Sequence, residues 1–296
     1  ELVAHLERTV KIQRANNQRA HVRDQWWLFE HFRPGLYRAI AGIKDVLCAP
    51  QTSKYRIFTR VSYEVLFDQT IMIFSMEGWH AFGLLQSRPH EVWAGFFASS
   101  LEDRLRYIPS DCFETFPFPE SWEQNAPLEV AGKDYYEFRA ALMRRDCQGL
   151  TDIYNRFHDP DDHDPEIEQL RALHAAMDRA VLDAYGWTDI PTDCDFFLDY
   201  EIDEETWGDK KKPYRYRWPD SVRDEVLARL LDLNQKRYQE EVAAGLHGKL
   251  DKAAPGAAKK PTAKAPRKPA KAPARSKAPP PNETLALFPS AQEDES

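Results

Sequence analysis

Residues 86–119 read QSRPHEVWAGFFASSLEDRLRYIPSDCFETFPFP, and this stretch decides the fold. Val92, Trp93, Phe96 and Phe97 fall on one face at helical spacing, which predicts a short aromatic helix over 90–97. The segment ends in the tetrapeptide FPFP, which cannot be helical because each proline forces an extended backbone on the residue before it. A rigid exit therefore follows the helix.

Between these two ends, apolar and charged residues alternate. Leu101, Leu105 and Tyr107 are separated by charged side chains, the period of two that is typical of a half-buried strand. Such a strand would present Arg104 and Arg106 on one face. Guanidinium groups in this arrangement can read guanine edges, although an ordinary exposed strand has the same pattern.

The stretch is similar to a known family in the segments LQS-x-x-HEVW (85–93) and LRY-x-PSDCFETFPFP (105–119). It resembles the C-terminal target-recognition region of MmeI-like (type IIL/IIG) restriction–modification enzymes and related adenine-N6 DNA methyltransferases. The resemblance continues in WWLFEHFRPGLYRAI (26–40), VLCAPQTSKYRIF (46–58), the segment 150–187 and the segment 215–237. It implies double-stranded DNA as a partner, together with an N-terminal methyltransferase domain.

Composition and charge are compatible with this reading. The formal net charge is −8, but it is segregated along the chain. Residues 1–60 hold eleven Lys or Arg against five Asp or Glu, and 151–210 hold four against eighteen. A chain with segregated charge can present a basic surface to DNA while it stays acidic overall. The four cysteines form no CxxC pair, no apolar run is long enough to span a membrane, and no signal peptide is apparent, so we expect a cytoplasmic, nucleoid-associated protein.

The predicted fold class is α+β, with a small, mainly antiparallel sheet and helices, followed by a helical region and a disordered tail. The expected divisions are a helical segment over 1–44, a target-recognition core over 45–125, a helical region over 126–246 and a tail over 247–296. The first segment reads as a helix to about residue 32, with arginines that are either solvated or in contact with phosphate, and Pro34 begins a short second helix. Strands are expected over 46–50, 55–61, 64–67 and 70–76, and later helices over 134–147, 150–157 and 164–186. The sequence begins at Glu1, which suggests a piece of a longer protein.

The candidate DNA-contacting residues lie in two places. A polar loop, Gln51 to Lys54, follows the first predicted strand, and strand parity over YRIFTRV (55–61) would place two arginines on one face. His90 is either a helix-start residue or a partner for phosphate or backbone. A carboxylate at Glu102 can accept from cytosine or orient an arginine. The full candidate set is Ser53, Lys54, Arg56, Arg60, His90, Glu102, Arg104 and Arg106.

Three sequence patterns resemble catalytic or metal-binding motifs, but we expect none of them to have that function. His90-Glu91 lacks the second histidine of HExxH, because position 94 is alanine. The acidic turn HDPDDHDP (158–165) reads as a capping turn rather than a metal site, with Asp164 as the helix cap. Pro160-Asp161 with Asp209-x-Lys211 matches the letters of a nuclease motif, but its residues fall in turns.

The chain also lacks the motifs of a complete methyltransferase. No NPPY or DPPY tetrapeptide occurs, and the Gly-containing turn that binds S-adenosylmethionine is missing. We therefore expect no catalytic residue and no cofactor in this chain, with S-adenosylmethionine in the missing domain and Mg²⁺ only if a nuclease is fused. The alternative hypothesis is a non-catalytic protein-interaction module of a phage-defence system.

The Lys/Ala/Pro-rich tail is predicted to be a cationic tether, because it cannot bury enough apolar surface to fold. Near its end, residues 284–288 read TLALF, a short apolar cluster flanked by acids. This cluster resembles the pentapeptide by which bacterial proteins bind the replication sliding clamp. It departs from that motif at Thr284, and a tail end without a partner is the alternative.

Overall fold

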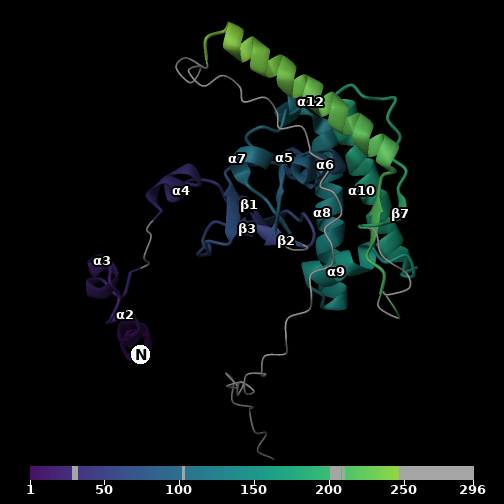
Figure 1. The fold of residues 1–296 in the computed structure, drawn as a ribbon. Helices are drawn as coiled ribbons and strands as arrows, with labels where there is room; N and C mark the ends of the chain where they lie inside the picture. Colours follow the sequence, from purple (N-terminus) through teal and green to yellow (C-terminus); the bar gives the residue numbers. More distant parts are fainter. Residues whose placement is uncertain (29–32, 102–103, 201–207, 209–210, 247–296) are drawn as a thin grey trace, which may run out of the picture. The chain divides into compact units, whose positions relative to one another are not determined.

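The structure is a computed structural model that describes residues 1–28, 33–101, 104–200, 208 and 211–246, with backbone alone for 99–101 and 104–105. Residues 1–246 form one compact unit, and residues 247–296 form a second unit, which lies outside the described residues. The fold is mixed α+β, as predicted (Figure 1). Among the described helices, none is long and apolar enough to cross a membrane.

The N-terminal segment is not the single helix that the sequence predicts. It consists of α1 (Leu2–Leu6), a π-helical turn (Glu7–Lys11), α2 (Ile12–Arg14) and α3 (Ala20–Asp24). The break before α3 has a local cause, because the side chain of Asn17 accepts a hydrogen bond from the backbone of Arg19 at 2.9 Å. Asparagine side chains compete with helical hydrogen bonds in this way. The next helix, α4 (Pro34–Ala39), begins at a proline as predicted.

The first sheet has the order β3–β1–β4 and is antiparallel throughout. Its central strand, β1 (Asp45–Pro50), is buried from Val46 to Ala49, and it is flanked by β3 (Thr59–Ser62) and β4 (Ile71–Phe74). The apolar run EVLF (64–67) was expected as a strand, but it contains a turn and mostly exposed residues. No described strand pairs with this run, and most of its side chains are exposed.

The second sheet corrects the prediction of one strand over 101–107. The backbone forms a hairpin of β5 (Ser99–Leu101) and β6 (Arg104–Arg106), and β2 (Thr52–Ser53) pairs with the other edge of β6. Alternation alone cannot distinguish one strand from two that reverse between them. The hairpin keeps Arg104 and Arg106 on the central strand of this sheet.

Two helices connect the sheets to the helical region. α5 (Trp79–Gln86) was not predicted, because it is buried from Ala81 to Gln86 and carries no polar face to reveal its period. α6 (Arg88–Phe97) confirms the predicted aromatic helix. α5 packs on α8 (Ala126–Asp146) at Gly132, where an added Cβ would lie 2.3 Å from the carbonyl oxygen of Trp79. Only glycine permits this close approach.

The remaining helices follow their capping residues. α8 begins eight residues before the predicted start, because the side chain of Asn125 accepts from Leu128 N at 3.0 Å and caps it. α9 (Leu150–Phe157) and α10 (Pro165–Ala184) match the predictions, and Asp164 caps α10 as expected. After α7 (Pro109–Cys112) and the hairpin of β7 (Asp195–Leu198) with β8 (Tyr214–Arg217), α12 (Asp220–Ala243) ends the described unit.

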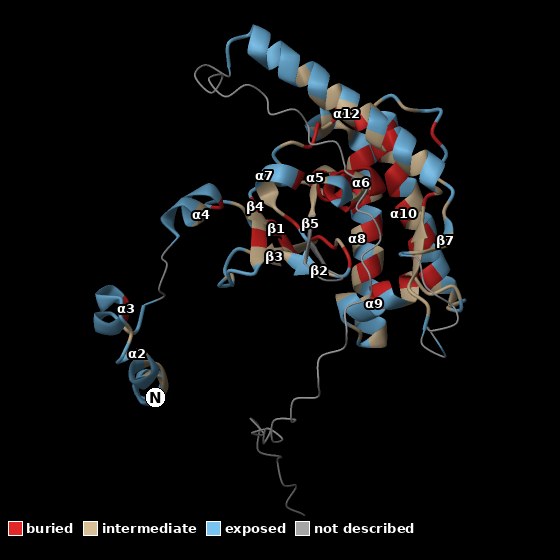
Figure 2. Ribbon diagram, viewed as in Figure 1, coloured by how far each residue is buried: buried red, intermediate tan, exposed pale blue. Residues whose placement is uncertain are grey.

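The main core lies between the first sheet and α5, α8, α9 and α10, whose facing residues are buried (Figure 2). Arg139 of α8 is almost completely buried inside it and is 1% exposed. Its guanidinium donates to the carbonyl oxygen of Phe58 at 2.8 Å, to Tyr154 Oη at 3.0 Å and to Gln86 Oε1 at 3.3 Å. Arg139 therefore connects α5, α9 and the segment just before β3 through a single side chain.

Replacing Arg139 by methionine is expected to lower the free energy of unfolding by about 3 kcal/mol. The change keeps most of the volume but leaves the Phe58 carbonyl buried without its Arg139 donor and removes one of the two donors to Gln86 Oε1. Denaturant unfolding measures the effect, and Arg144→Met on the exposed side of the same helix serves as the control. Equal stabilities of the two variants would show that Arg139 is not a structural hub.

Candidate nucleic-acid interface

The second sheet brings together two predicted groups of contact residues that are far apart in the sequence. In its antiparallel register, Thr52 pairs with Arg106, and Ser53 pairs with Leu105. The loop before β2 is fixed by its backbone, since Gln51 N donates to Thr70 O at 2.8 Å and Gln51 O accepts from Tyr107 N at 2.9 Å. The polar loop and the arginine hairpin therefore form one surface. Arg106 is exposed on it.

Lys54 extends this surface and is held in place by the helical region. Its Nζ donates to Asn155 Oδ1 of α9 at 3.1 Å and lies 4.8 Å from the ring centre of Tyr55. Its carbonyl oxygen accepts from Arg215 Nη2 at 2.6 Å. Ser53 is partly buried, and its hydroxyl accepts from Tyr55 N at 3.3 Å. These bonds orient the lysine but leave its exposed ammonium group available to a further acceptor.

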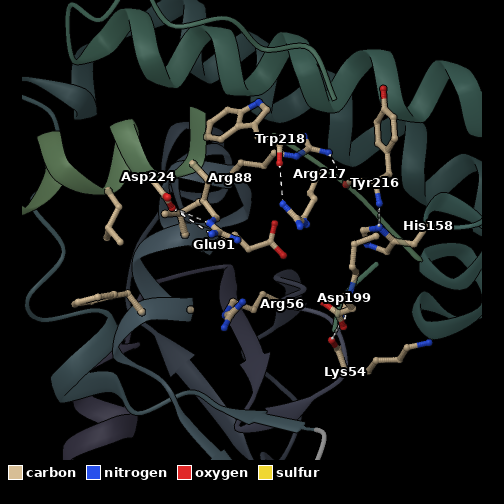
Figure 3. A pocket seen from close by; sticks show the side chains of 16 residues that line it. Lys54, Arg56, Arg88, Glu91, His158, Asp199, Tyr216, Arg217, Trp218 and Asp224 are labelled. Atoms are coloured by element: carbon tan, nitrogen blue, oxygen red, sulfur yellow. Dashed lines mark hydrogen bonds and ion pairs between the residues drawn. The ribbon is translucent and has the colours of Figure 1, made fainter. Parts of the chain in front are cut away.

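Arg56 and Arg60 do not share a face, contrary to the prediction from strand parity. The chain leaves the extended pairing after β2 and resumes it only at β3, so parity is not maintained between the two residues. Arg60 lies with its guanidinium 4.5 Å from the ring centre of Trp79 and donates to Gly78 O at 3.1 Å. Arg56 instead lines a cavity against α6 (Figure 3).

His90 is wholly buried, at 0% exposure, so it cannot touch a duplex in this conformation. Its Nδ1 lies 2.8 Å from Leu85 O, and a carbonyl only accepts, so Nδ1 carries the proton. Nε2 then accepts from Tyr107 Oη at 3.1 Å. Burial lowers the pKa of His90 to about 3, so the ring is neutral at physiological pH. His90 therefore belongs to the core, where its ring contacts those of Phe58, Tyr107 and Phe116.

The structure describes the two other predicted residues only in part. Glu102 lies outside the described residues, and Arg104 is placed by its backbone in β6 without a described side chain. Prediction also missed Arg215 of β8, which lies 4.5 Å over the Tyr55 ring and pairs with Asp199 at 3.0 Å. The signal was the YRYR alternation of residues 214–217, which places basic and aromatic side chains on opposite faces of a strand.

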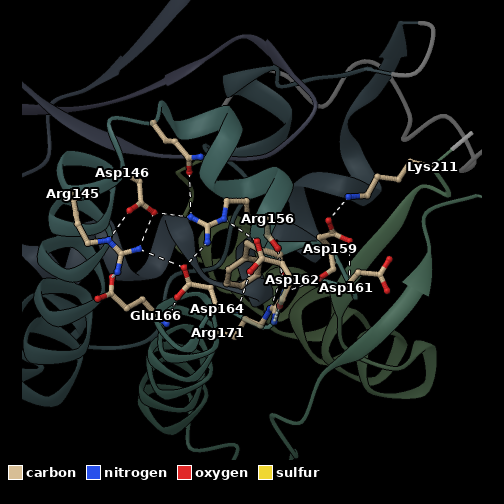
Figure 4. A network of polar contacts seen from close by, with 12 residues as sticks. Arg145, Asp146, Arg156, Asp159, Asp161, Asp162, Asp164, Glu166, Arg171 and Lys211 are labelled. Atoms are coloured by element: carbon tan, nitrogen blue, oxygen red, sulfur yellow. Dashed lines mark hydrogen bonds and ion pairs between the residues drawn. The ribbon is translucent and has the colours of Figure 1, made fainter.

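The acidic turn over 158–165 is held together by arginines (Figure 4). Arg156 contacts Asp146, Asp162 and Asp164 at 2.6–2.8 Å. The pKa of Asp164 is lowered by its capping bond to Glu166 N and by Arg156. Within the described part of the chain, no group of three His, Cys, Asp or Glu side chains is placed to hold a metal ion.

His158 of the acidic turn and Lys211 of the nuclease-like pattern also have bonding partners within the protein. His158 Nδ1 accepts from Tyr216 N at 3.0 Å, and burial lowers the pKa of this histidine well below its ordinary value. Lys211 pairs with Asp159, while Asp209 of the nuclease-like motif lies outside the described residues. The contacts of Asp159 and Lys211 therefore connect the acidic turn to the segment before β8.

Comparison with known proteins identifies the class first: residues 8–120 match the model of a target recognition domain. The model is that of the MmeI target recognition domain, so the resemblance found in the sequence is confirmed for this part of the chain. Among solved structures, the chain is similar to the type IIL restriction–modification enzyme MmeI in complex with DNA, with a TM-score of 0.54 and 20% identity. The similarity covers 81% of this chain and 27% of that enzyme, and it shows a shared fold. No curated protein matches the chain.

The buried histidines predict how stability depends on pH. Unfolded histidine has a pKa of about 6.5, so between pH 6.5 and 3 the unfolded state binds a proton that folded His90 does not. The free energy of unfolding should therefore fall as the pH is lowered through this window, by up to about 1.4 kcal/mol per pH unit for each such histidine. Denaturant unfolding at pH 7, 6 and 5 measures the slope.

The slope should be shallower in His90→Gln, whereas a change at the exposed His21 to glutamine should leave it as in the unchanged protein. His158 contributes in the same direction and keeps part of the slope in the His90 variant. Identical slopes for the His90 variant and the unchanged protein would contradict the assignment of a neutral, buried ring.

Proposed function

We propose that the chain is the DNA-sequence-reading part of a site-specific adenine-N6 DNA methyltransferase or of a fused restriction–modification enzyme, acting in the cytoplasm at the nucleoid. The observation that carries the proposal is the match of residues 8–120 to the MmeI target recognition domain. The chain spans about a quarter of the similar enzyme, 27% of its length, so a catalytic domain would lie in the remainder of a parent protein.

The second sheet supplies the chemistry for base readout. A β-ribbon fits the major groove, where an arginine makes a bidentate pair with O6 and N7 of guanine and a carboxylate accepts from cytosine N4. We assign Arg104, Arg106 and Glu102 to these roles, with Ser53 at the ribbon's edge. Arg106 supports the assignment because it is exposed on the sheet's central strand.

Other basic residues would act on the phosphate backbone. Lys54 is exposed beside the second sheet, and a phosphate contact needs a positive charge rather than a match to a particular base edge. Arg60 is half-buried with its guanidinium over the Trp79 ring, so we expect it to position neighbouring groups rather than to contact phosphate itself. The tail and its apolar segment 284–288 lie outside the described residues, and contact of that segment with a sliding clamp stays a proposal.

In a complete enzyme, the DNA would be held between this chain and the methyltransferase domain, with the target adenine extruded toward the latter. S-adenosylmethionine would bind in that second domain, and Mg²⁺ would be needed only by a fused nuclease. A phage-defence interaction module is the alternative function. Salt separates the two, because DNA affinity falls steeply with ionic strength, whereas an aromatic protein interface does not depend on salt in this way.

Changing Arg106 to alanine is expected to weaken binding to the cognate duplex by about 1–3 kcal/mol and to relax discrimination at one base pair. Selection from random duplexes defines the cognate site, and fluorescence anisotropy compares that site with a random sequence. Arg38→Ala, an exposed arginine of α4, serves as the control. Equal losses on cognate and random duplexes would make Arg106 a phosphate contact.

Deleting residues 249–281, which hold ten Lys or Arg and one acid, tests the tail by the same assay. The deletion should weaken binding to all sequences alike and make the dependence of affinity on salt shallower, because fewer counterions are released. An unchanged salt slope would show that the tail does not lie along the phosphates.

The chain alone should neither bind S-adenosylmethionine nor transfer methyl groups. The reason is the missing NPPY-type tetrapeptide and Gly-containing turn. Isothermal calorimetry with S-adenosylmethionine checks this, with a complete adenine methyltransferase as the positive control. Saturable binding to this chain would contradict the division of labour between the two domains.

A further inference from the structure

A cavity of about 600 Å³ lies between α6, β8 and the start of α12 (Figure 3). This volume is in the range of small-molecule sites. Apolar side chains line one part of the cavity, where Val92 and Leu227 lie near Phe96, which is 58% exposed. Charged side chains line the rest, and they include the basic Arg56, Arg215 and Arg217 and the acidic Glu91, Asp199 and Asp224. The lining therefore combines an apolar surface with cationic groups, as a ligand with an aromatic body and an acidic group would require.

Hydrogen-bond donors without acceptors are concentrated at this cavity. Three buried side-chain atoms have no hydrogen-bond partner among the described residues: Arg56 Nη2, Arg88 Nε and Trp218 Nε1. All three residues line the cavity, and all three atoms are N–H donors. A buried donor without a partner costs about 1–3 kcal/mol, and a ligand relieves that cost only where it can approach the side chain concerned.

Among these three residues, Arg56 is the one that carries a charge without an ion pair in the described part of the chain. Its guanidinium lies in the centre of the lining side chains, with its Nη2 against Gly95 of α6, where an added Cβ would be 3.5 Å away (Figure 3). Burial lowers the pKa of this group, and the carboxylate of Glu91 opposes that effect only through space, without an ion pair between the two described side chains. A buried charge in this position is normally paired.

Most of the other charged side chains of the lining are paired, whereas Lys54 and Glu91 have no ion pair among the described residues. Arg215 pairs with Asp199 at 3.0 Å, Arg223 with Asp224 at 3.2 Å, and Arg217 with Asp220 at 2.5 Å. Arg88 is paired with Asp178, a residue outside the lining. Arg56 is therefore the lining guanidinium that lacks such an ion pair, and an anion would complete it.

We propose that this cavity binds a phosphate monoester that carries an aromatic ring, the chemistry of a nucleotide. The phosphate would accept from the guanidinium of Arg56 and from the exposed ammonium group of Lys54, the two lining cations without an ion pair among the described residues. A phosphate monoester, which can carry two negative charges, suits these two cations better than a singly charged carboxylate does. The ring would lie on Phe96, Val92 and Leu227. The source is either a free mononucleotide or an unpaired nucleotide of a DNA strand, and the proposal does not depend on sequence-specific recognition of a duplex.

Calorimetry of the full chain with AMP tests the proposal, with adenosine and inorganic phosphate as partial ligands. AMP should bind saturably and more tightly than either partial ligand. Arg56→Gln should weaken AMP binding at least tenfold, whereas Arg144→Gln on the exposed side of α8 should not change it. A single-stranded oligonucleotide that displaces AMP would assign the site to a DNA strand, and AMP binding without displacement would assign it to the free nucleotide.

Thermal unfolding supplies a readout that separates binding from structure. Because the Arg56 guanidinium lacks a partner for Nη2, Arg56→Gln should unfold at the same temperature as the unchanged protein or higher when no ligand is present. AMP should raise the unfolding temperature of the unchanged protein alone. The proposal is overturned if the unchanged protein binds neither AMP nor phosphate, or if Arg56→Gln binds AMP equally well.

Discussion

The buried ion pair between Arg88 and Asp178 is the interaction on which the arrangement of the molecule depends. Arg88 is 3% exposed and Asp178 is fully buried. The guanidinium donates to one carboxylate oxygen at 2.5 Å, and the backbone N–H of Arg88 donates to the other at 2.8 Å. Burial alone would raise the pKa of Asp178, but the neighbouring His174 and Arg88 lower it, so the carboxylate stays charged.

This pair fixes the geometry between two parts of the chain. Arg88 begins α6, inside the part that matches the target recognition domain, whereas Asp178 lies in α10 of the helical region. Arg88 Nη2 also donates to Tyr216 O of β8 at 3.2 Å. A buried ion pair adds little net stability compared with apolar packing, but it is very costly to misalign. It therefore selects one way of docking the helices on the sheets, and the cavity lined by Arg56 lies beside this junction.

The parts of the fold that could be predicted are those specified by local chemistry. Asp164 and Pro34 mark helix starts that the structure confirms, because capping and proline geometry act over a few residues. The parts that could not be predicted depend on distant partners. Alternation over 101–107 does not reveal a reversal of the chain, and α5 is buried from Ala81 to Gln86, chiefly against the distant α8. The candidate site divides in the same way: Arg106 is exposed on its strand, whereas the burial of His90 depends on Tyr107 and the surrounding core.

The pairing of β2 with β6 limits how this protein can acquire new sequence preferences. The backbone of Gln51 is hydrogen-bonded to both Thr70 and Tyr107. The next two residues pair in register with β6, the strand that carries Arg104 and Arg106. Inserting or deleting one residue here would turn every following side chain of the ladder to the opposite face. Replacing one side chain by another preserves the ladder. Variation within this lineage should therefore accumulate as exchanges at fixed positions of the ribbon, while the length of the segment from 51 to 54 stays constant.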